Sequence, residues 1–449
     1  MTRMEEALLH ATDTKACVIG ENVLGQVPGL LKRHFPDATR AVVVVDPRTW
    51  AAAGEKVSAL LKEAGLAVSQ YMFEPDGKTF HADYHYAAEL REALKAEIAQ
   101  APNETLVPVA VGSGVVNDLT KLASGEIGNL PYLVCATAAS VDGYSSFGAA
   151  IRSPEGAKQT YACPAPRVIV ADLDVMRTAP KWMAASGFAD LLAKVPAGAD
   201  WILAYELGAT PWHDRAWHTV QDGLPEALSN PEGVAAMETE PLTKFVEGLM
   251  LGGFAMQDMQ SSRPASGAEH MFSHILEMHN HTYKGEIVPH GIQVGVYTHF
   301  MAKFYEKILA FDYTQLDVDA CVAAWPDWSV EESVAKKLFE GTPFPDVGVT
   351  TTKAKYLDKK GLRDQLMIAK TRWPEIKARL EKQLLPADEI ARRLRVVGAP
   401  VFPEEIGTTR EASLASVNVA CHMRDRYNAL DFTYRTQQMM SFAQSAFGL

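Results

Sequence analysis

Two histidines and an aspartate, far apart in the chain, have side chains that could bind one metal ion. They are Asp190, His270 and His290. One carboxylate and two imidazoles leave coordination positions open for water or substrate, which a catalytic metal needs and a structural metal does not. If the three residues converge in the fold, the chain is a metalloenzyme.

The same residues also have simpler interpretations. His270 and His274 are four residues apart, so on a helix they share one face, and each could be either a ligand or a packing side chain. Asp190 and Lys194 have the same spacing, which is also that of a surface ion pair on a helix. His290 stands between a proline and a glycine at a predicted helix start, which favours a fixed ligand position.

A glycine-rich segment, residues 112–118, stands between a predicted strand and a predicted helix. Glycines let the backbone approach a phosphate, and the start of a helix offers free N–H groups and a positive dipole. The segment is therefore interpreted either as a phosphate loop or as an ordinary strand-to-helix turn. Asn117 stands where the third glycine of the usual dinucleotide pattern would be.

Two further polar positions follow predicted strands. Asp46 ends an apolar run, and its carboxylate could accept hydrogen bonds from a ribose or cap the next helix. It precedes the glycine loop, whereas the usual fingerprint places the acid after it. Residues 137–146 follow another strand, and their small hydroxylated side chains could line a pocket, or form a serine-rich turn capped by Asp142.

Composition limits the kind of protein this is. The chain has 449 residues and a formal net charge of -12, which argues against a nucleic-acid partner. A phosphorylated substrate would need a local basic or metal site. Five scattered cysteines without a CxxC pair are typical of reduced thiols. No window approaches the roughly 18 apolar residues of a membrane span, and no signal-peptide core is seen, so we expect a cytoplasmic protein without membrane insertion.

Strand and helix patterns alternate up to about Met176, which predicts a parallel sheet covered by helices. Beyond it strand patterns almost vanish. Strands are predicted at 41–46, 66–73, 106–111, 132–137 and 167–171, a hairpin at 149–151 with 158–162, and helices at 49–64, 84–100 and 116–123. The later helices are predicted at 184–207, 243–259, 268–277, 290–308, 330–339, 362–384 and 387–395.

The predicted fold class is α/β. A Rossmann-like parallel-sheet domain, residues 1–176, binds the dinucleotide and is followed by an all-helical domain, residues 177–449, that binds metal and substrate. The cleft between two such domains is the expected place for a site.

Taken together, the motifs resemble the sn-glycerol-1-phosphate dehydrogenase family. This family is part of the superfamily of iron-type alcohol dehydrogenases, glycerol dehydrogenases and dehydroquinate synthases. The matching pieces lie between residues 112 and 291 and are GSGVVND, TAASVDGYSS, SGFADLLAK, SRPASGAEHMFSH and PHG. The resemblance implies a dehydroquinate synthase-like fold. The region after about residue 311 carries no motif of this resemblance.

The resemblance also implies a role for each matching residue. Asp190, His270 and His290 would be the metal ligands. Asp142, Asp190 and His274 would contact the substrate and take part in catalysis. The contacts to NAD(H) or NADP(H) would come from Asp46, Gly112, Ser113, Gly114, Val115, Val116, Thr137, Ala138, Ala139, Ser140 and Ser146.

The implied activity is reversible hydride transfer between the nicotinamide and C2 of dihydroxyacetone phosphate, which gives sn-glycerol 1-phosphate. One divalent ion, zinc, nickel or iron, would polarise the C2 carbonyl. A homodimer is the family expectation. Asp46 would repel a 2′-phosphate and so favours NADH over NADPH.

Three alternatives stay open. A glycerol or other alcohol dehydrogenase of the same superfamily would act on an unphosphorylated substrate. A dehydroquinate synthase-like lyase would need several basic residues around a polyanion. A non-catalytic nucleotide-binding protein would not need an open metal position. The basic residues near the motifs are Lys194, Arg152, Lys158, Arg263 and Lys284.

Overall fold

The computed structural model describes residues 1–75, 80–154 and 158–449. The chain forms two compact units. The first consists of Met1–Leu191 and Arg215–Ser262, and the second of Leu192–Asp214 and Arg263–Leu449. The division into domains 1–176 and 177–449 stays a prediction.

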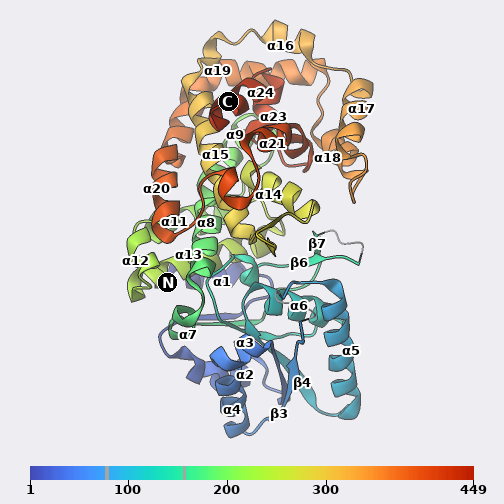
Figure 1. Cartoon of the computed structure of the whole chain (residues 1–449), viewed down its shortest axis with the longest axis vertical. Helices are drawn as coiled ribbons and strands as arrows, with labels where there is room; N and C mark the ends of the chain where they lie inside the picture. Colours follow the sequence, from blue (N-terminus) through green and yellow to red (C-terminus); the bar gives the residue numbers. More distant parts are fainter. Residues whose placement is uncertain (76–79, 155–157) are drawn as a thin grey trace. The chain divides into compact units, whose positions relative to one another are not determined.

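A six-stranded parallel sheet is the frame of the first unit (Figure 1). Its strand order is β1-β8-β5-β4-β2-β3. The runs of valine in β2 and β4 are buried almost throughout, as expected for strands covered on both faces. The strands are β1 (Ala16–Gly20), β2 (Ala38–Val45), β3 (Ala67–Met72), β4 (Thr105–Gly112), β5 (Leu133–Ala136) and β8 (Val168–Asp172).

Helices cover both faces of this sheet. Val43 and Val45 belong to a core that also contains residues of α2 and α4. Successive strand side chains point to opposite faces, so Val42 and Val44 face the other side, where α5 and α6 pack together. The helices of this unit include α1 (Arg3–His10), α2 (Val27–His34), α4 (Glu55–Glu63), α5 (Tyr84–Gln100), α6 (Gly114–Gly125), α7 (Leu173–Thr178), α8 (Lys181–Leu192), α10 (Asp214–Gln221), α11 (Leu224–Ala227), α12 (Pro231–Ala235) and α13 (Thr239–Met259).

The structure confirms the predicted alternation and adds to the six-stranded sheet one strand, β1, that the prediction missed. Strand β1 pairs with β8 at the sheet edge and is only partly buried, so its apolar pattern is weak. The predicted hairpin is confirmed as β6 (Ala149–Arg152) paired antiparallel with β7 (Lys158–Tyr161). The prediction of a single helix over 184–207 is wrong, because two helices cover this range. Helix α8 ends at Leu192 and a new helix starts at Lys194. Pro196 lies in the first turn of that new helix, where its missing N–H is tolerated.

The second unit is almost entirely helical. Its short strands β9 (Thr282–Tyr283) and β10 (Glu286–Ile287) form a small hairpin between α14 and α15. In the described part of the chain, no helix is long and apolar enough to cross a membrane. The helices are α9 (Lys194–Glu206), α14 (Ala268–Met278), α15 (His290–Ala310), α16 (Val318–Ala324), α17 (Trp328–Phe339), α18 (Val347–Lys355), α19 (Lys359–Gln383), α20 (Ala387–Val397), α21 (Arg410–Ala415), α22 (Val417–His422), α23 (Ala429–Arg435) and α24 (Met439–Phe447).

Candidate active site

The glycine loop turns directly from β4 into α6. A Cβ on Gly112 would lie 2.5 Å from the Cβ of Val116, so only glycine fits where the strand end meets the first helical turn. At Gly114, by contrast, an added Cβ would meet only Val141, at an ordinary 3.6 Å. Gly112 is therefore required by the fold, while Gly114 leaves the start of a 12-residue helix open to approach.

The segment after β5, residues 137–140, lies beside this loop. The Thr137 N–H donates to the Gly112 carbonyl at 3.1 Å, and the hydroxyls of Ser113 and Ser140 are 2.6 Å apart. Strands β4 and β5 are neighbours in the sheet, which brings their two following loops to the same edge. The residues predicted to contact the cofactor in these two segments are thus brought together.

Asp46 follows β2, the other neighbour of β4. Val44 pairs with Ala110, so Asp46 leaves the sheet at the same edge as the glycine loop. Its Oδ1 accepts hydrogen bonds from the N–H groups of Arg48 at 2.7 Å and Thr49 at 3.0 Å. The structure confirms the capping interpretation, and ribose binding stays a prediction.

A buried lysine holds the loop that carries Asp142 and Ser146. The Lys121 ammonium is fully buried and donates to the carbonyls of Gly143, Ser146 and Gly148 at 2.9–3.0 Å. A buried cation normally needs such partners to offset lost hydration. The Ser146 hydroxyl itself donates to the Gly143 carbonyl at 2.9 Å. Lys121 is therefore a positioning residue for the predicted cofactor and substrate loop.

Helix α13 fixes the same loop from another side. A Cβ on Gly253 would lie 2.0 Å from Oγ of Ser145, so the helix approaches the loop as closely as glycine allows. The Ser145 hydroxyl donates to the Met250 carbonyl at 3.1 Å, and the Gln257 amide donates to the Ser145 carbonyl at 2.6 Å. The loop is thus held mainly through backbone carbonyls.

Asp190 is placed by a similar close approach. A Cβ on Gly187 would lie 2.2 Å from the Ala139 carbonyl oxygen, so α8 passes directly against the segment after β5. Asp190 Oδ2 then accepts a hydrogen bond from the Asp142 N–H at 3.1 Å. Asp190 and Lys194 are both fully buried, so the interpretation as a surface ion pair is wrong.

Carboxylates orient the two predicted histidine ligands. Nδ1 of His270 lies 2.8 Å from Oε1 of Glu269, and Nδ1 of His290 lies 2.9 Å from Oε1 of Glu277. A carboxylate at Nδ1 assigns the proton to that nitrogen and leaves the Nε2 lone pair for a metal. This is the usual arrangement of metal-binding histidines.

Glu277 also contacts the third histidine. Its Oε2 lies 3.3 Å from Nδ1 of His274, and the rings of His274 and His290 are stacked with centroids 6.2 Å apart. Burial lowers the pKa of His274 to about 3, so the ring is neutral near pH 7. With Nδ1 beside a carboxylate, Nε2 of His274 is left as a hydrogen-bond acceptor.

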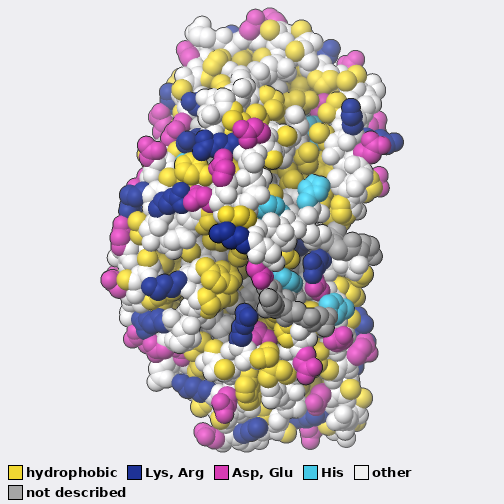
Figure 2. Space-filling model, viewed as in Figure 1, with side chains coloured by type: hydrophobic (Ala, Val, Ile, Leu, Met, Phe, Trp, Pro, Cys, Tyr) yellow, Lys and Arg dark blue, Asp and Glu magenta, His cyan; other side chains and the backbone are white. Residues whose placement is uncertain are grey.

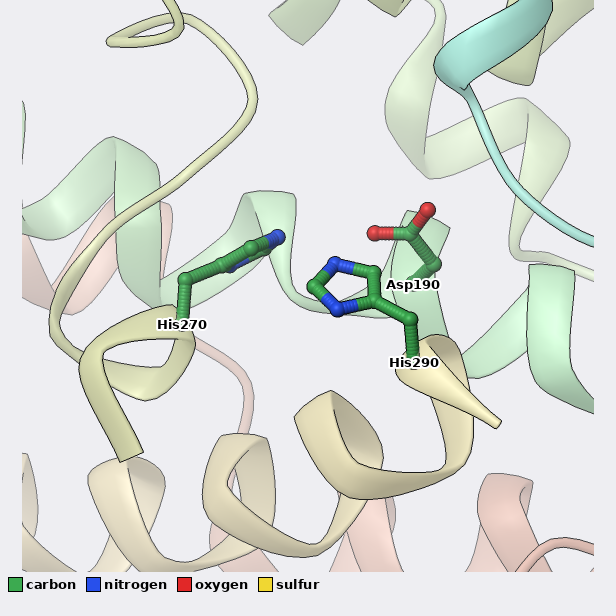
Figure 3. Close-up of side chains that lie close together, drawn as sticks. All are labelled: Asp190, His270 and His290. Atoms are coloured by element: carbon green, nitrogen blue, oxygen red, sulfur yellow. The ribbon is translucent and has the colours of Figure 1, made fainter. Parts of the chain in front are cut away.

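The predicted metal ligands lie together. Asp190, His270 and His290 each offer one ligand atom, and these atoms all lie within 4.8 Å of one another. Figure 3 shows the three side chains pointing toward one another. Ligand atoms that bind a common ion at about 2.0–2.2 Å lie up to about 4 Å apart, so small side-chain movements would close the set. The donors and their carboxylate partners fit a divalent cation.

Sequence reasoning missed the residues that hold these groups. Glu277 stands three residues after His274, and this spacing could have indicated a shared helix face. Glu269 directly precedes a predicted ligand. Lys121 and Gln257 gave no such signal, because a lone polar residue in a helix is usually solvated.

Several known proteins resemble this chain in sequence. A family model described as iron-containing alcohol dehydrogenase matches residues 18–180. Glycerol-1-phosphate dehydrogenase [NAD(P)+] of Halalkalibacterium halodurans is 34% identical over 290 residues, which cover 64% of this chain and 70% of that protein. The protein of the same description from Pyrococcus furiosus is 31% identical over 285 residues, covering 64% and 77%.

A solved structure extends the likeness to nearly the whole chain. Glycerol dehydrogenase from Schizosaccharomyces pombe superposes with a TM-score of 0.58 and 19% identity, covering 97% of this chain and 91% of that one. At this identity the likeness shows the fold alone. It confirms the predicted fold class, including the helical region after residue 311 that carried no motif.

Proposed function

This chain belongs to the glycerol-1-phosphate dehydrogenase family, and on that premise we propose that it interconverts dihydroxyacetone phosphate and sn-glycerol 1-phosphate. The reaction is hydride transfer between NAD(H) or NADP(H) and C2 of the substrate. The observation that carries the proposal is the convergence of Asp190, His270 and His290, whose ligand atoms lie within 4.8 Å of one another. The hydrogen bond from Asp142 to Asp190 links this set to the loop beside the glycine turn.

The dinucleotide would lie along the sheet edge where β2, β4 and β5 end. Gly112 to Val116 would bind the pyrophosphate through backbone N–H groups, and Asp46 would accept from the ribose hydroxyls. The remaining contacts to the dinucleotide would come from Thr137, Ala138, Ala139, Ser140 and Ser146. Support for this arrangement comes from the hydrogen bonds that join the two loops.

Asp190, His270 and His290 would hold one divalent ion, zinc, nickel or iron. When bound, the ion supplies Lewis-acid polarisation of the C2 oxygen. Glu269 and Glu277 keep the two imidazole rings in the ligating orientation through their Nδ1 atoms. Asp142 would hydrogen-bond the substrate, and Nε2 of His274 would orient the C2 oxygen or relay a proton to it.

The test is NAD(P)H oxidation by the metal-loaded protein with dihydroxyacetone phosphate, beside unphosphorylated dihydroxyacetone. The proposal expects kcat/KM to be higher by about a thousandfold or more for the phosphorylated substrate, because a site that binds a charged group discriminates strongly against its absence. Equal or greater activity on dihydroxyacetone, or on glycerol with NAD, would make the chain an unphosphorylated-alcohol dehydrogenase instead.

We further propose a cytoplasmic homodimer. The five cysteines are free, which suits a reducing compartment. Light scattering at several protein concentrations measures the oligomeric state directly, and a monomeric mass throughout would contradict the dimer.

A further inference from the structure

Three arginines gather in the second unit beside the start of α14. Arg263 precedes this helix, while Arg424 and Arg426 lie in the segment that joins α22 to α23. The Arg426 guanidinium donates to the carbonyl of Ser266, two residues before α14 begins. Helix α14 also packs against α22. The segment between α22 and α23 is therefore anchored to the helix that carries His270 and His274.

The charges of Arg263 and Arg424 both act on Arg426. Burial lowers the pKa of Arg426 to about 9, with further lowering by the charges of Arg263 and Arg424. The opposite charges of Asp425 and Glu269 do not offset these effects. Arg426 nevertheless stays protonated near pH 7. The cluster thus combines three guanidinium groups of weakened hydration with nearby carboxylates, of which Asp425 acts on all three arginines.

The cluster lies next to the predicted chemistry. Arg424 follows α22, which packs against α14, the helix of His274 and Glu277. Burial lowers the pKa of Arg424, while the charges of Asp425 and Glu277 raise it, which agrees with a position near Glu277. As whole residues, Arg424 is exposed and Arg426 is intermediate, so solvent reaches both although the surrounding protein reduces the hydration of their guanidinium groups, whereas Arg263 is buried. Acidic and basic side chains are mixed over the face of the molecule that Figure 2 shows.

We propose that Arg424 and Arg426 bind the phosphate group of the triose substrate, and that the buried Arg263 adds its positive charge from inside the fold. This rests on the proposed function and supplies the phosphate contacts that the motifs left unassigned. Guanidinium groups pair with phosphate oxygens through parallel N–H···O hydrogen bonds. A bound dianion would also remove the repulsion among the three cations. Phosphate on Arg424 would leave the carbon skeleton beside His274.

The first test compares Arg424→Gln and Arg424→Lys in the metal-loaded enzyme. With dihydroxyacetone phosphate, Arg424→Gln should raise KM by about a hundredfold, as loss of a charged hydrogen-bond partner does. Arg424→Lys keeps the charge and should lose less. With dihydroxyacetone, which has no phosphate, kcat/KM should change less than threefold. Equal losses on both substrates, or no loss on either, would overturn the inference.

A matched control is Arg363→Gln. Arg363 is also an exposed arginine of the second unit, and it pairs with Asp319 at 2.6 Å. This variant should keep wild-type KM values for both substrates. A rise in KM as large as that of Arg424→Gln would show that loss of any surface cation, rather than this cluster, weakens phosphate binding.

A second measurement separates this inference from the proposed function. Inorganic phosphate at millimolar concentration should raise the Tm of wild type and of Arg363→Gln by several degrees, but not that of Arg424→Gln. If dihydroxyacetone phosphate is not a substrate but the Tm shift still depends on Arg424, the proposed function fails and the anion site stands. If it is a substrate and the shift is the same in Arg424→Gln, the arginine cluster is not the phosphate site.

Discussion

The loops after β4 and β5 and the histidines of α14 and α15 are held in place by different chemistry. The loops are fixed by hydrogen bonds from Lys121 and Gln257 to loop carbonyls, by a hydrogen bond from Ser145 to a carbonyl of α13, and by close contacts that only glycine permits. The histidines are fixed by side-chain carboxylates, Glu269 and Glu277. The first arrangement fixes the course of the backbone, and the second sets the orientation of a ring.

This difference predicts different consequences of substitution. A change among the groups that hold the loops should act on stability or on the approach of the nucleotide. A change among the histidines and their carboxylates should act on metal or substrate and leave the fold intact.

The largest effect is expected for His290→Ala. Loss of one of three ligands should remove the metal and lower kcat/KM by about a thousandfold or more. The unfolding transition should keep its wild-type cooperativity. Metal content by elemental analysis measures the outcome, and full occupancy in this variant would remove His290 from the ligand set.

Lys121→Met tests how the loop after β5 is held. It leaves three buried carbonyls without their donor and removes the charge 3.4 Å from Asp118. We expect the free energy of unfolding to fall by about 3–5 kcal/mol, the usual cost of breaking a buried charged contact. Chemical denaturation measures it. A loss below about 1 kcal/mol would show that the loop does not depend on Lys121.

His274→Ala should separate substrate chemistry from metal binding. We expect full metal occupancy and unchanged NADH affinity, with kcat/KM about a hundredfold lower, because an orienting or proton-transfer group is lost. Loss of metal would instead make His274 a ligand. Unchanged turnover would make it a packing residue.

Glu277→Gln addresses the orienting carboxylate. The amide keeps the shape but loses the charge beside Nδ1 of both His274 and His290. Metal affinity should fall by about 10–100-fold, as for other outer carboxylates of metal-binding histidines. The control is Glu332→Gln, at an exposed glutamate of the same unit. Equal metal dissociation constants in the two variants would rule out an orienting role for Glu277.

Gly114→Val has the smallest expected effect and tests backbone access at the loop. An added Cβ meets only Val141 at 3.6 Å, so the variant should fold. The bulk should nevertheless block the dinucleotide and weaken NADH binding by about tenfold. Titration of NADH fluorescence measures this, and wild-type affinity in the folded variant would place the pyrophosphate elsewhere.

Local pattern explains what the sequence could predict. Each predicted strand and long helix has its own local pattern of apolar residues. The glycine turn and the pair His270 and His274 are likewise formed by residues close together in the chain. The roles of Lys121 and Gln257 could not be predicted, because the loop carbonyls that they hold lie 22 or more residues away in the chain. The role of Arg424 and Arg426 was hidden for the same reason, since Ser266 is 160 residues from Arg426.

The most direct test of the account is a metal titration of the chelated, metal-free protein. Zinc, nickel or ferrous ion is added in known amounts, and both bound metal and NADH oxidation with dihydroxyacetone phosphate are measured. The account predicts that activity rises in proportion to bound metal and saturates at about one ion per chain. Full activity without bound metal, or saturation with metal without any activity on dihydroxyacetone phosphate, would contradict it.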